Sequence, residues 1–134
     1  MEQILKNIFL LLLIFSASLF AELTNEYASQ KLLDDKTPVV DIRTPPEWIE
    51  TGLLKGAIPI MFFNERGDYN IEKFLTELNK KVDTTKPFAL ICRTGSRTKI
   101  LSQFLSKEMN YKVINLKGGM MLAKGKNLPT VSYK

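Results

Sequence analysis

The chain has 134 residues, a formal net charge of +5, one cysteine and no histidine. A single cysteine excludes an internal disulfide. The lack of histidine then excludes zinc and iron–sulfur ligand sets, and also every Cys–His catalytic arrangement. We therefore expect neither a metal nor a cofactor. The lysines are scattered along the chain, which is typical of a solvated surface with at most a weak preference for anions.

Residues 1–21 have the pattern of a secretory signal peptide. Lys6 and the amino terminus supply positive charge, the stretch 8–15 is apolar, and small residues follow it. As a helix, the uncharged residues up to Ala21 would span about 22 Å, which is short of the roughly 30 Å of a bilayer core. We expect cleavage after Ala21. Cleavage after Ser18 is one alternative, and an uncleaved membrane anchor is the other.

Residues 22–134 are enough for one compact domain with its own core. The signal peptide predicts that this domain is periplasmic or secreted, with no stable membrane insertion after cleavage. Nucleic acid is therefore not an expected partner. A single thiol on an exported chain indicates reactive chemistry, or else a disulfide to another chain.

The first predicted element of the domain is a helix from Thr24, its N-cap, to Leu33, with Tyr27 and Leu32 facing inward. The elements that follow are strand 39–42, a short helix from 45 to about 52, a short strand at 57–58, loop 64–70, helix 71–82, strand 88–91, helix 99–108, strand 112–116 and a short helix 120–126. A tail ends the chain. Strands that alternate with helices predict a parallel sheet covered on both faces.

Two of these elements frame the one cysteine. The strand 88–91 is fully apolar, which predicts a buried, central position in the sheet. The helix 99–108 is expected to face the core with Ile100, Leu101, Phe104 and Leu105. Cys92 follows the strand directly. Because parallel sheets bind ligands beyond the carboxyl ends of their strands, Cys92 stands where a ligand is expected.

The segment from Cys92 to Arg97 reads Cys-Arg-Thr-Gly-Ser-Arg. A strand, a tight loop with a glycine and then a helix bring several backbone N–H groups and the positive end of a helix dipole to one point. A free cysteine thiol has a pKa of about 8.5, so a nucleophilic cysteine needs positive neighbours, and Arg93 and Arg97 supply them. The pattern predicts a reactive thiolate beside an anion site rather than an inert core cysteine.

Three blocks of residues, in this order, resemble the single-domain form of the rhodanese homology domain. They are Asp41-Ile42-Arg43 with Glu47-Trp48, Gly52 and Gly56-Ala57; the Cys92–Arg97 loop with Thr98; and Asn115-Leu116-Lys117-Gly118-Gly119-Met120. The resemblance covers nearly all of 22–134. It departs from the family pattern at Leu53, where a histidine is common, and at Ala123, where a tryptophan is frequent.

The resemblance implies an α/β, rhodanese-like three-layer fold for 22–134 and the activity of a sulfurtransferase of the thiosulfate:cyanide type. Cys92 is the implied nucleophile, which takes the outer sulfur of a small anionic donor such as thiosulfate or a polysulfide. The resulting persulfide then passes its sulfur to a thiol, sulfite or cyanide, in two covalent steps. A protein sulfur donor or acceptor is the other kind of partner that the resemblance implies.

The remaining loop residues are the implied substrate-binding residues. The N–H groups of Thr94, Gly95, Ser96 and Arg97 are expected to stabilise the persulfide anion. Arg93 is expected to hold the sulfonate of the donor. Arg97 is expected to brace the loop and add positive field, and a purely structural ion pair is its alternative role.

Four further residues of the blocks are interpreted as structural. Asp41 lies at a strand end, and Arg43 and Glu47 are four residues apart, a spacing that suits an ion pair between them. Thr98 is expected to cap the helix or to stand in its first turn.

Other classes of protein share parts of this pattern. Phosphatases and arsenate reductases of the same fold place five residues between the cysteine and the arginine, whereas four stand between Cys92 and Arg97. The smaller loop favours a single sulfur atom over a whole phosphate. A persulfide carrier, or a binding protein without turnover of its own, remains an alternative that the sequence does not separate from a free-standing enzyme.

Overall fold

The computed structural model describes residues 2–4 and 22–134. Residues 1 and 5–21, which include most of the predicted signal peptide and its cleavage zone, lie outside the described residues. Within the described part of the chain, no helix has both the length and the apolar character that crossing a membrane requires.

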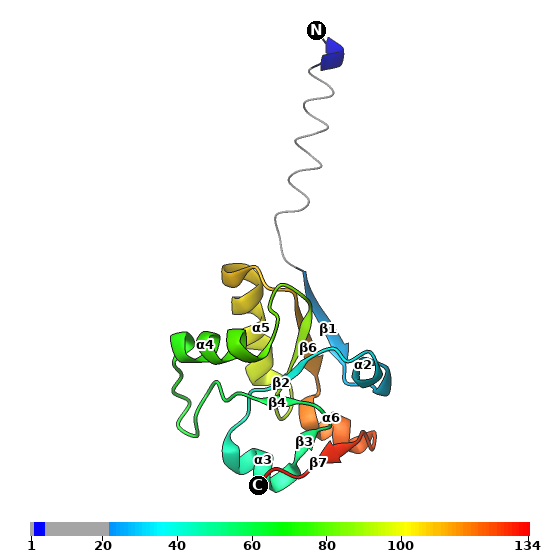
Figure 1. Ribbon diagram of the computed structural model, residues 1–134, viewed down its shortest axis with the longest axis vertical. Coiled ribbons are helices and arrows are strands. Elements are labelled where there is room, and N and C mark those ends of the chain that lie inside the picture. The colour runs from blue at the N-terminus through cyan, green and yellow to red at the C-terminus, as the bar shows by residue number, and fades with distance from the viewer. Residues whose placement is uncertain (1, 5–21) are drawn as a thin grey trace.

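A five-stranded parallel sheet forms the middle layer of the domain (Figure 1). Its strands lie in the order β1-β6-β5-β2-β4, and each neighbouring pair is parallel. Their bounds are β1 Leu23–Tyr27, β2 Val39–Asp41, β4 Ile58–Pro59, β5 Phe88–Ile91 and β6 Val113–Lys117. The strand that ends at the cysteine, β5, is the central one, as its apolar sequence predicts.

Helices cover both faces of the sheet. On one face lie α4 (Ile71–Lys81) and α5 (Ser96–Met109), and on the other lie α2 (Gln30–Asp34) and α6 (Gly119–Gly125) (Figure 1). The short helix α3 (Pro45–Thr51) lies with α6 at the carboxyl ends of the strands. The predicted three-layer α/β architecture is confirmed.

The central strand shows why both faces need a helical layer. Phe88 and Leu90 pack into the hydrophobic cluster that includes residues of α4 and α5, while Ala89 and Ile91 pack into the cluster that includes residues of α2 and α6. All four side chains are fully buried. Burying one Leu, Ile or Phe side chain contributes roughly 1.5–3 kcal/mol. Two-sided burial therefore holds β5 firmly, and with it the position of Cys92.

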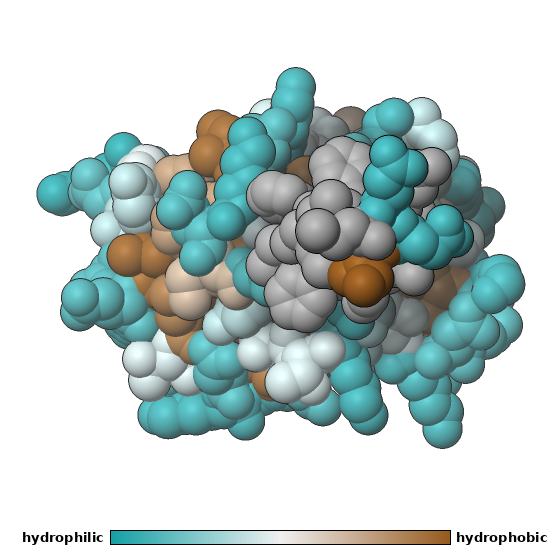
Figure 2. Space-filling model, turned by 90° about the horizontal axis from the view of Figure 1, so that it is seen from above, coloured by the Kyte–Doolittle hydropathy of each residue, from teal (hydrophilic) through white to brown (hydrophobic). Residues whose placement is uncertain are grey.

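The helix α4 forms as its sequence predicts. Asn70 caps it by accepting a hydrogen bond from the Lys73 N–H, and Lys80 and Lys81 lie in the last turn, where they complement the helix dipole. Phe74 and Leu78 are its buried residues. On the side of the molecule that Figure 2 shows, hydrophilic side chains dominate the coloured surface, and hydrophobic ones form smaller areas among them.

The predicted helix from Thr24 to Leu33 is wrong in its first half. Residues 23–27 form β1, which pairs with β6 along its whole length, and Tyr27 is 54% exposed instead of facing inward. The helix α2 begins only at Gln30, where Ser29 accepts a hydrogen bond from the Leu32 N–H. Pairing with a distant strand satisfies the backbone of β1 and outweighs the local capping signal at Thr24.

The prediction that four residues of the helix after the cysteine face the core is wrong for two of them. Leu101 and Leu105 are buried, but Ile100 is 61% exposed and Phe104 is 37% exposed. The other buried positions of α5 are hydroxyl residues, Thr98, Ser102 and Ser106. Because α5 places small polar side chains against the sheet, apolarity alone does not identify its inner face.

The chain's end also differs from the expected tail. Thr130–Val131 forms β7, which pairs antiparallel with β3, Leu53–Leu54. Leu53 and Leu54 are buried, so the residue that departs from the family pattern at 53 lies in the interior. Ala123, the other departure, is fully buried on α6.

Candidate active site

The cysteine loop joins the central strand to α5. Cys92 follows β5 directly, and Gly95, with φ 102°, is the N-cap of α5. This φ lies in the region that favours glycine, since a Cβ there meets the backbone. The tight turn brings the Gly95 N–H to the Cys92 sulfur, to which it donates a hydrogen bond of 3.2 Å. Thr98 Oγ1 lies 3.6 Å from the same sulfur.

The loop encloses the sulfur and turns its other side chains outward. The Cys92 side chain is 0% exposed, whereas Arg93, Thr94 and Ser96 are exposed. Of the predicted N–H donors, Gly95 is the one whose hydrogen bond to the sulfur is formed. The sulfur therefore has no surface open to solvent.

The start of α6 is hydrogen-bonded to the cysteine loop. The Met120 N–H donates to the Cys92 carbonyl oxygen at 2.8 Å, and the Met121 N–H donates to the Arg93 carbonyl oxygen at 3.1 Å. A Cβ on Gly119 would stand 2.5 Å from both of these carbonyl oxygens. Only glycine at 119 lets α6 come this close, which links the third sequence block physically to the cysteine loop.

Arg97 makes a two-fold ion pair with Glu47 of α3. Its Nη1 and Nη2 donate to Glu47 Oε1 and Oε2, each at 2.8 Å. Hydrogen bonds from Arg97, its positive charge and hydrogen bonds from Thr44 lower the pKa of Glu47 from 4.5 to about 2, against the opposing effect of burial. The hydrogen bonds with Glu47 likewise raise the pKa of Arg97 above its usual value. The guanidinium of Arg97 is thus occupied by a protein carboxylate.

The ion pair expected between Arg43 and Glu47 is therefore wrong. Arg43 is fully buried and pairs with Asp41, its Nη2 lying 2.8 Å from Asp41 Oδ2, and it reaches Glu47 only through the backbone oxygen of that residue at 3.4 Å. Trp48 Nε1 also donates to Asp41. The buried pair joins the end of β2 to α3, so it sets the position from which Glu47 meets Arg97.

A cavity of about 280 Å³ opens beside the loop, between α3 and α6. Of the predicted substrate-binding residues, Arg93 lines it. The other lining residues are Arg43, Glu47, Glu50, Thr51, Met120, Met121 and Lys124. Lys124 Nζ donates to the Thr51 carbonyl oxygen at 3.4 Å. The sequence analysis did not single out Lys124, Met121 or Glu50, and no local signal could have done so, because only the packing of α3 near α6 gathers them.

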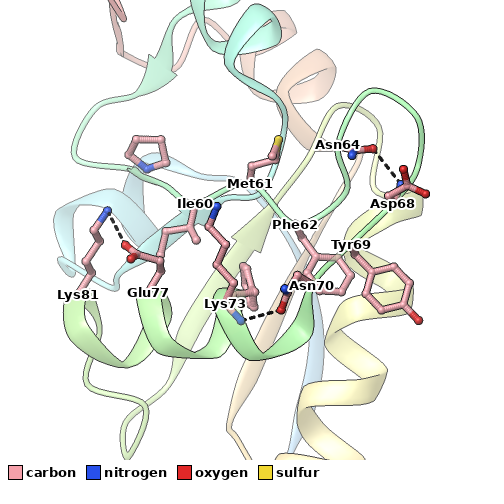
Figure 3. Close-up of a pocket in the computed structure, with 12 residues that line it drawn as sticks. Ile60, Met61, Phe62, Asn64, Asp68, Tyr69, Asn70, Lys73, Glu77 and Lys81 are labelled. Atoms are coloured by element: carbon pink, nitrogen blue, oxygen red, sulfur yellow. Dashed lines mark hydrogen bonds and ion pairs between the residues drawn. The ribbon is translucent and has the colours of Figure 1, made fainter.

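A larger cavity, of about 430 Å³, lies elsewhere, between the segment 59–62 and α4 (Figure 3). Lys73, Glu77 and Lys81 lie along its helical side, where Glu77 and Lys81 pair at 3.5 Å. None of the predicted site residues lines this cavity. Across the described residues, no three His, Cys, Asp or Glu side chains are grouped so that they could hold a metal ion.

Comparisons with known proteins agree with the three sequence blocks. The family model described as "Rhodanese-like domain" matches residues 24–125. The chain is 30% identical over 112 residues to a protein named "Sulfurtransferase" from Allochromatium vinosum, covering 83% of this chain and 94% of that protein. It is 29% identical over 96 residues to "Putative sulfurtransferase YtwF" from Bacillus subtilis, covering 72% of this chain and 82% of the relative.

A third relative has another function. The chain is 37% identical over 92 residues to the "tRNA uridine(34) hydroxylase" of Pelagibacter ubique, covering 68% of this chain but only 28% of that longer protein. The similarity to the two sulfurtransferases extends over most of their lengths, and the family match covers most of this chain. The chain therefore belongs to the rhodanese-like domain family.

Proposed function

We propose that this protein is a sulfurtransferase that carries sulfane sulfur as a persulfide on Cys92. The observation that carries the proposal is the enclosed sulfur: the Gly95 N–H donates to it, and Thr98 Oγ1 of the first turn of α5 lies 3.6 Å from it. A backbone donor and a helix N-terminus favour a negative charge at that point. The same arrangement suits a thiolate and, once sulfur is added, a persulfide anion.

Transfer would proceed in two balanced steps. In the first, the Cys92 thiolate attacks the outer sulfur of thiosulfate, the donor's S–S bond breaks, and sulfite leaves with the bonding electron pair. In the second, a nucleophilic acceptor (a thiol, sulfite or cyanide) attacks the outer sulfur of the persulfide, and Cys92 leaves as a thiolate. In each step the transferred sulfur forms a bond to the nucleophile as its bond to the leaving group breaks. Neither an oxidant nor a metal is therefore consumed.

The two arginines of the loop would have different roles. Arg97 is engaged with Glu47 in two hydrogen bonds, so it supports the loop and contributes positive charge from a fixed place. Arg93 is exposed and lines the cavity beside the loop, so its guanidinium is the one available to an incoming anion. Thiosulfate ends in a sulfonate that Arg93 would hold while its outer sulfur approaches Cys92.

We also propose where the protein acts and which class of compound supplies its sulfur. The signal-like sequence of residues 1–21 favours a periplasmic or secreted enzyme. A small anionic sulfur compound is the donor class, and a persulfide carrier that exchanges sulfur with partner proteins is the alternative function. The loop of four residues between Cys92 and Arg97 favours sulfur over a phosphate or arsenate substrate.

Mass spectrometry of the intact protein tests the proposal directly. After incubation with thiosulfate or a polysulfide, we expect the mass of one added sulfur atom, removable by cyanide with release of thiocyanate. A protein that gains no sulfur from either donor would contradict the proposed function. Repeated turnover with cyanide would favour an enzyme, and a single stoichiometric discharge would favour a carrier.

A further inference from the structure

The cavity beside the cysteine loop has a volume and an apolar lining that thiosulfate, a donor of five atoms, does not require. Its volume of about 280 Å³ is just below the roughly 300–1,000 Å³ of pockets for small organic molecules. One wall is formed by two methionines of α6, Met120 and Met121. Thioether side chains adapt to irregular apolar groups, so this wall suits a ligand with methylene carbons.

Three positive and two negative side chains line the same cavity, and two of these five are already paired with residues outside it, Arg43 with Asp41 and Glu47 with Arg97. Arg93 enters from the cysteine loop and Lys124 from α6. Among the described residues, the ion pairs are Lys31–Asp35, Asp41–Arg43, Glu77–Lys81 and Glu47–Arg97, so neither Arg93 nor Lys124 is neutralised by a carboxylate. Lys124 Nζ donates to a backbone carbonyl oxygen of α3, at 3.4 Å. Glu50 of α3 is the remaining carboxylate of the lining, so Arg93 and Lys124 leave the cavity with one net positive charge next to its methionines. This combination suits a ligand with an anionic end and a carbon chain.

We propose that this cavity binds the sulfur acceptor, and that the acceptor is a small thiol that carries a carboxylate. Lys124 and Arg93 hold the carboxylate, and Met120 and Met121 pack against the carbons between the carboxylate and the thiol. Lys124 is then a specificity-determining residue. This inference rests on the proposed function, because it concerns the second half of the same transfer.

The chemistry of the step is balanced without a further reactant. The acceptor's thiolate attacks the outer sulfur of the Cys92 persulfide, the new S–S bond forms, and the bond to Cys92 breaks with its electron pair leaving on Cys92. The outer sulfur stands about 2.05 Å beyond the buried Cys92 sulfur. Arg93 follows Cys92 in the chain and lines the cavity, so a ligand held at its guanidinium lies beside the loop that carries the persulfide.

A single-turnover discharge experiment tests this assignment. The protein and its Lys124→Gln variant are each loaded with thiosulfate, and the loaded fraction is measured by mass. Sulfur loss is then timed with 3-mercaptopropionate, which has a carboxylate, and with neutral 2-mercaptoethanol. The ratio of the two rates cancels any change in loading or in the persulfide itself. We expect Lys124→Gln to lower this ratio about fivefold, as for the loss of one partly exposed ion pair.

Lys126→Gln is the matched control, since Lys126 lies just beyond α6 and does not line the cavity. We expect it to leave the ratio unchanged. A ratio that Lys124→Gln leaves unchanged would overturn the inference while leaving the proposed function intact. A ratio that falls equally in both variants would also overturn it, because only the overall charge would matter. Wild-type protein that does not load would overturn both proposals.

A binding measurement tests whether the cavity holds such a ligand when no sulfur can be transferred. We expect 3-(methylthio)propionate, which has the carboxylate and the carbon chain but no thiol, to shift the methyl resonances of Met120 and Met121 in a titration followed by NMR. The Met61 and Met109 methyls, which do not line this cavity, are the internal reference. Shifts confined to the two reference methyls, or no shifts at all, would contradict binding in this cavity.

Discussion

Arg97 and Glu47 lie 50 residues apart in the sequence and are joined by two hydrogen bonds of 2.8 Å each. The pair connects the first turn of α5, just after the cysteine loop, to α3. Its two side chains are 25% and 23% exposed. A partly buried pair with this parallel geometry is the kind that contributes measurably to stability, unlike most surface ion pairs.

The first prediction concerns the pH dependence of this pair. The pKa of Glu47 is lowered from 4.5 to about 2, so its stabilisation is fully present above pH 4.5 and is lost as the pH falls toward 2. Glu47→Gln should lower the free energy of unfolding by about 1–2 kcal/mol at pH 7 and by much less near pH 2.5. Urea denaturation at the two pH values measures both differences.

Glu77→Gln is the control for that measurement. Glu77 pairs with Lys81 at 3.5 Å on the exposed side of α4, and such a pair contributes little. An effect of Glu47→Gln that is the same at pH 7 and pH 2.5 would show that the ion pair is not its cause.

The second prediction is that Cys92→Ser removes all sulfur loading without unfolding the protein. A hydroxyl cannot form a persulfide, while oxygen differs little from sulfur in volume and can still accept the Gly95 N–H. Intact mass after thiosulfate gives the first readout, and circular dichroism on heating gives the second. A folded serine variant that still gains one sulfur atom would eliminate Cys92 as the sole acceptor.

The third prediction separates the two arginines. Arg93→Ala should slow loading from thiosulfate more than loading from a polysulfide, because only thiosulfate has a sulfonate for the guanidinium. The same variant should change stability by no more than about 0.5 kcal/mol, as expected for an exposed side chain. Loading rates for both donors test the first expectation, and a denaturation curve tests the second.

Arg97→Ala should behave in the opposite way. It leaves Glu47 without its charge partner, so we expect a loss of about 1–3 kcal/mol in stability and comparable slowing with both donors. If Arg93→Ala slowed both donors equally, the sulfonate-binding role of Arg93 would be ruled out.

The fourth prediction concerns the glycine beneath the loop. Gly119→Ala places a Cβ about 2.5 Å from the carbonyl oxygens of Cys92 and Arg93, at a φ of +56°. We expect a loss of roughly 1–3 kcal/mol in stability and slower sulfur loading, because the loop must shift. Gly125→Ala, at the other end of α6, meets nothing within 4 Å and should be neutral or slightly stabilising. Equal effects of the two substitutions would refute the close approach as the cause.

Much of this protein follows from its sequence alone, because the relevant signals are local. The all-apolar run 88–91 is a buried strand since every side chain needs a covered face, and the helix predicted over 71–82 is α4. The cysteine, the glycine that permits a positive φ and the helix after it are contiguous, so their loop could be read directly from residues 92–97.

The tertiary structure decided whatever depends on residues distant in the chain. Residues 23–27 became a strand because β6 offered a partner, against the local helix signal. Glu47 met Arg97 instead of its near neighbour Arg43, because Asp41 holds Arg43 in the interior. Lys124 and Met121 came to face Arg93 only because Gly119 lets α6 approach the cysteine loop. Such contacts are set by the packing of whole elements, which no short stretch of sequence encodes.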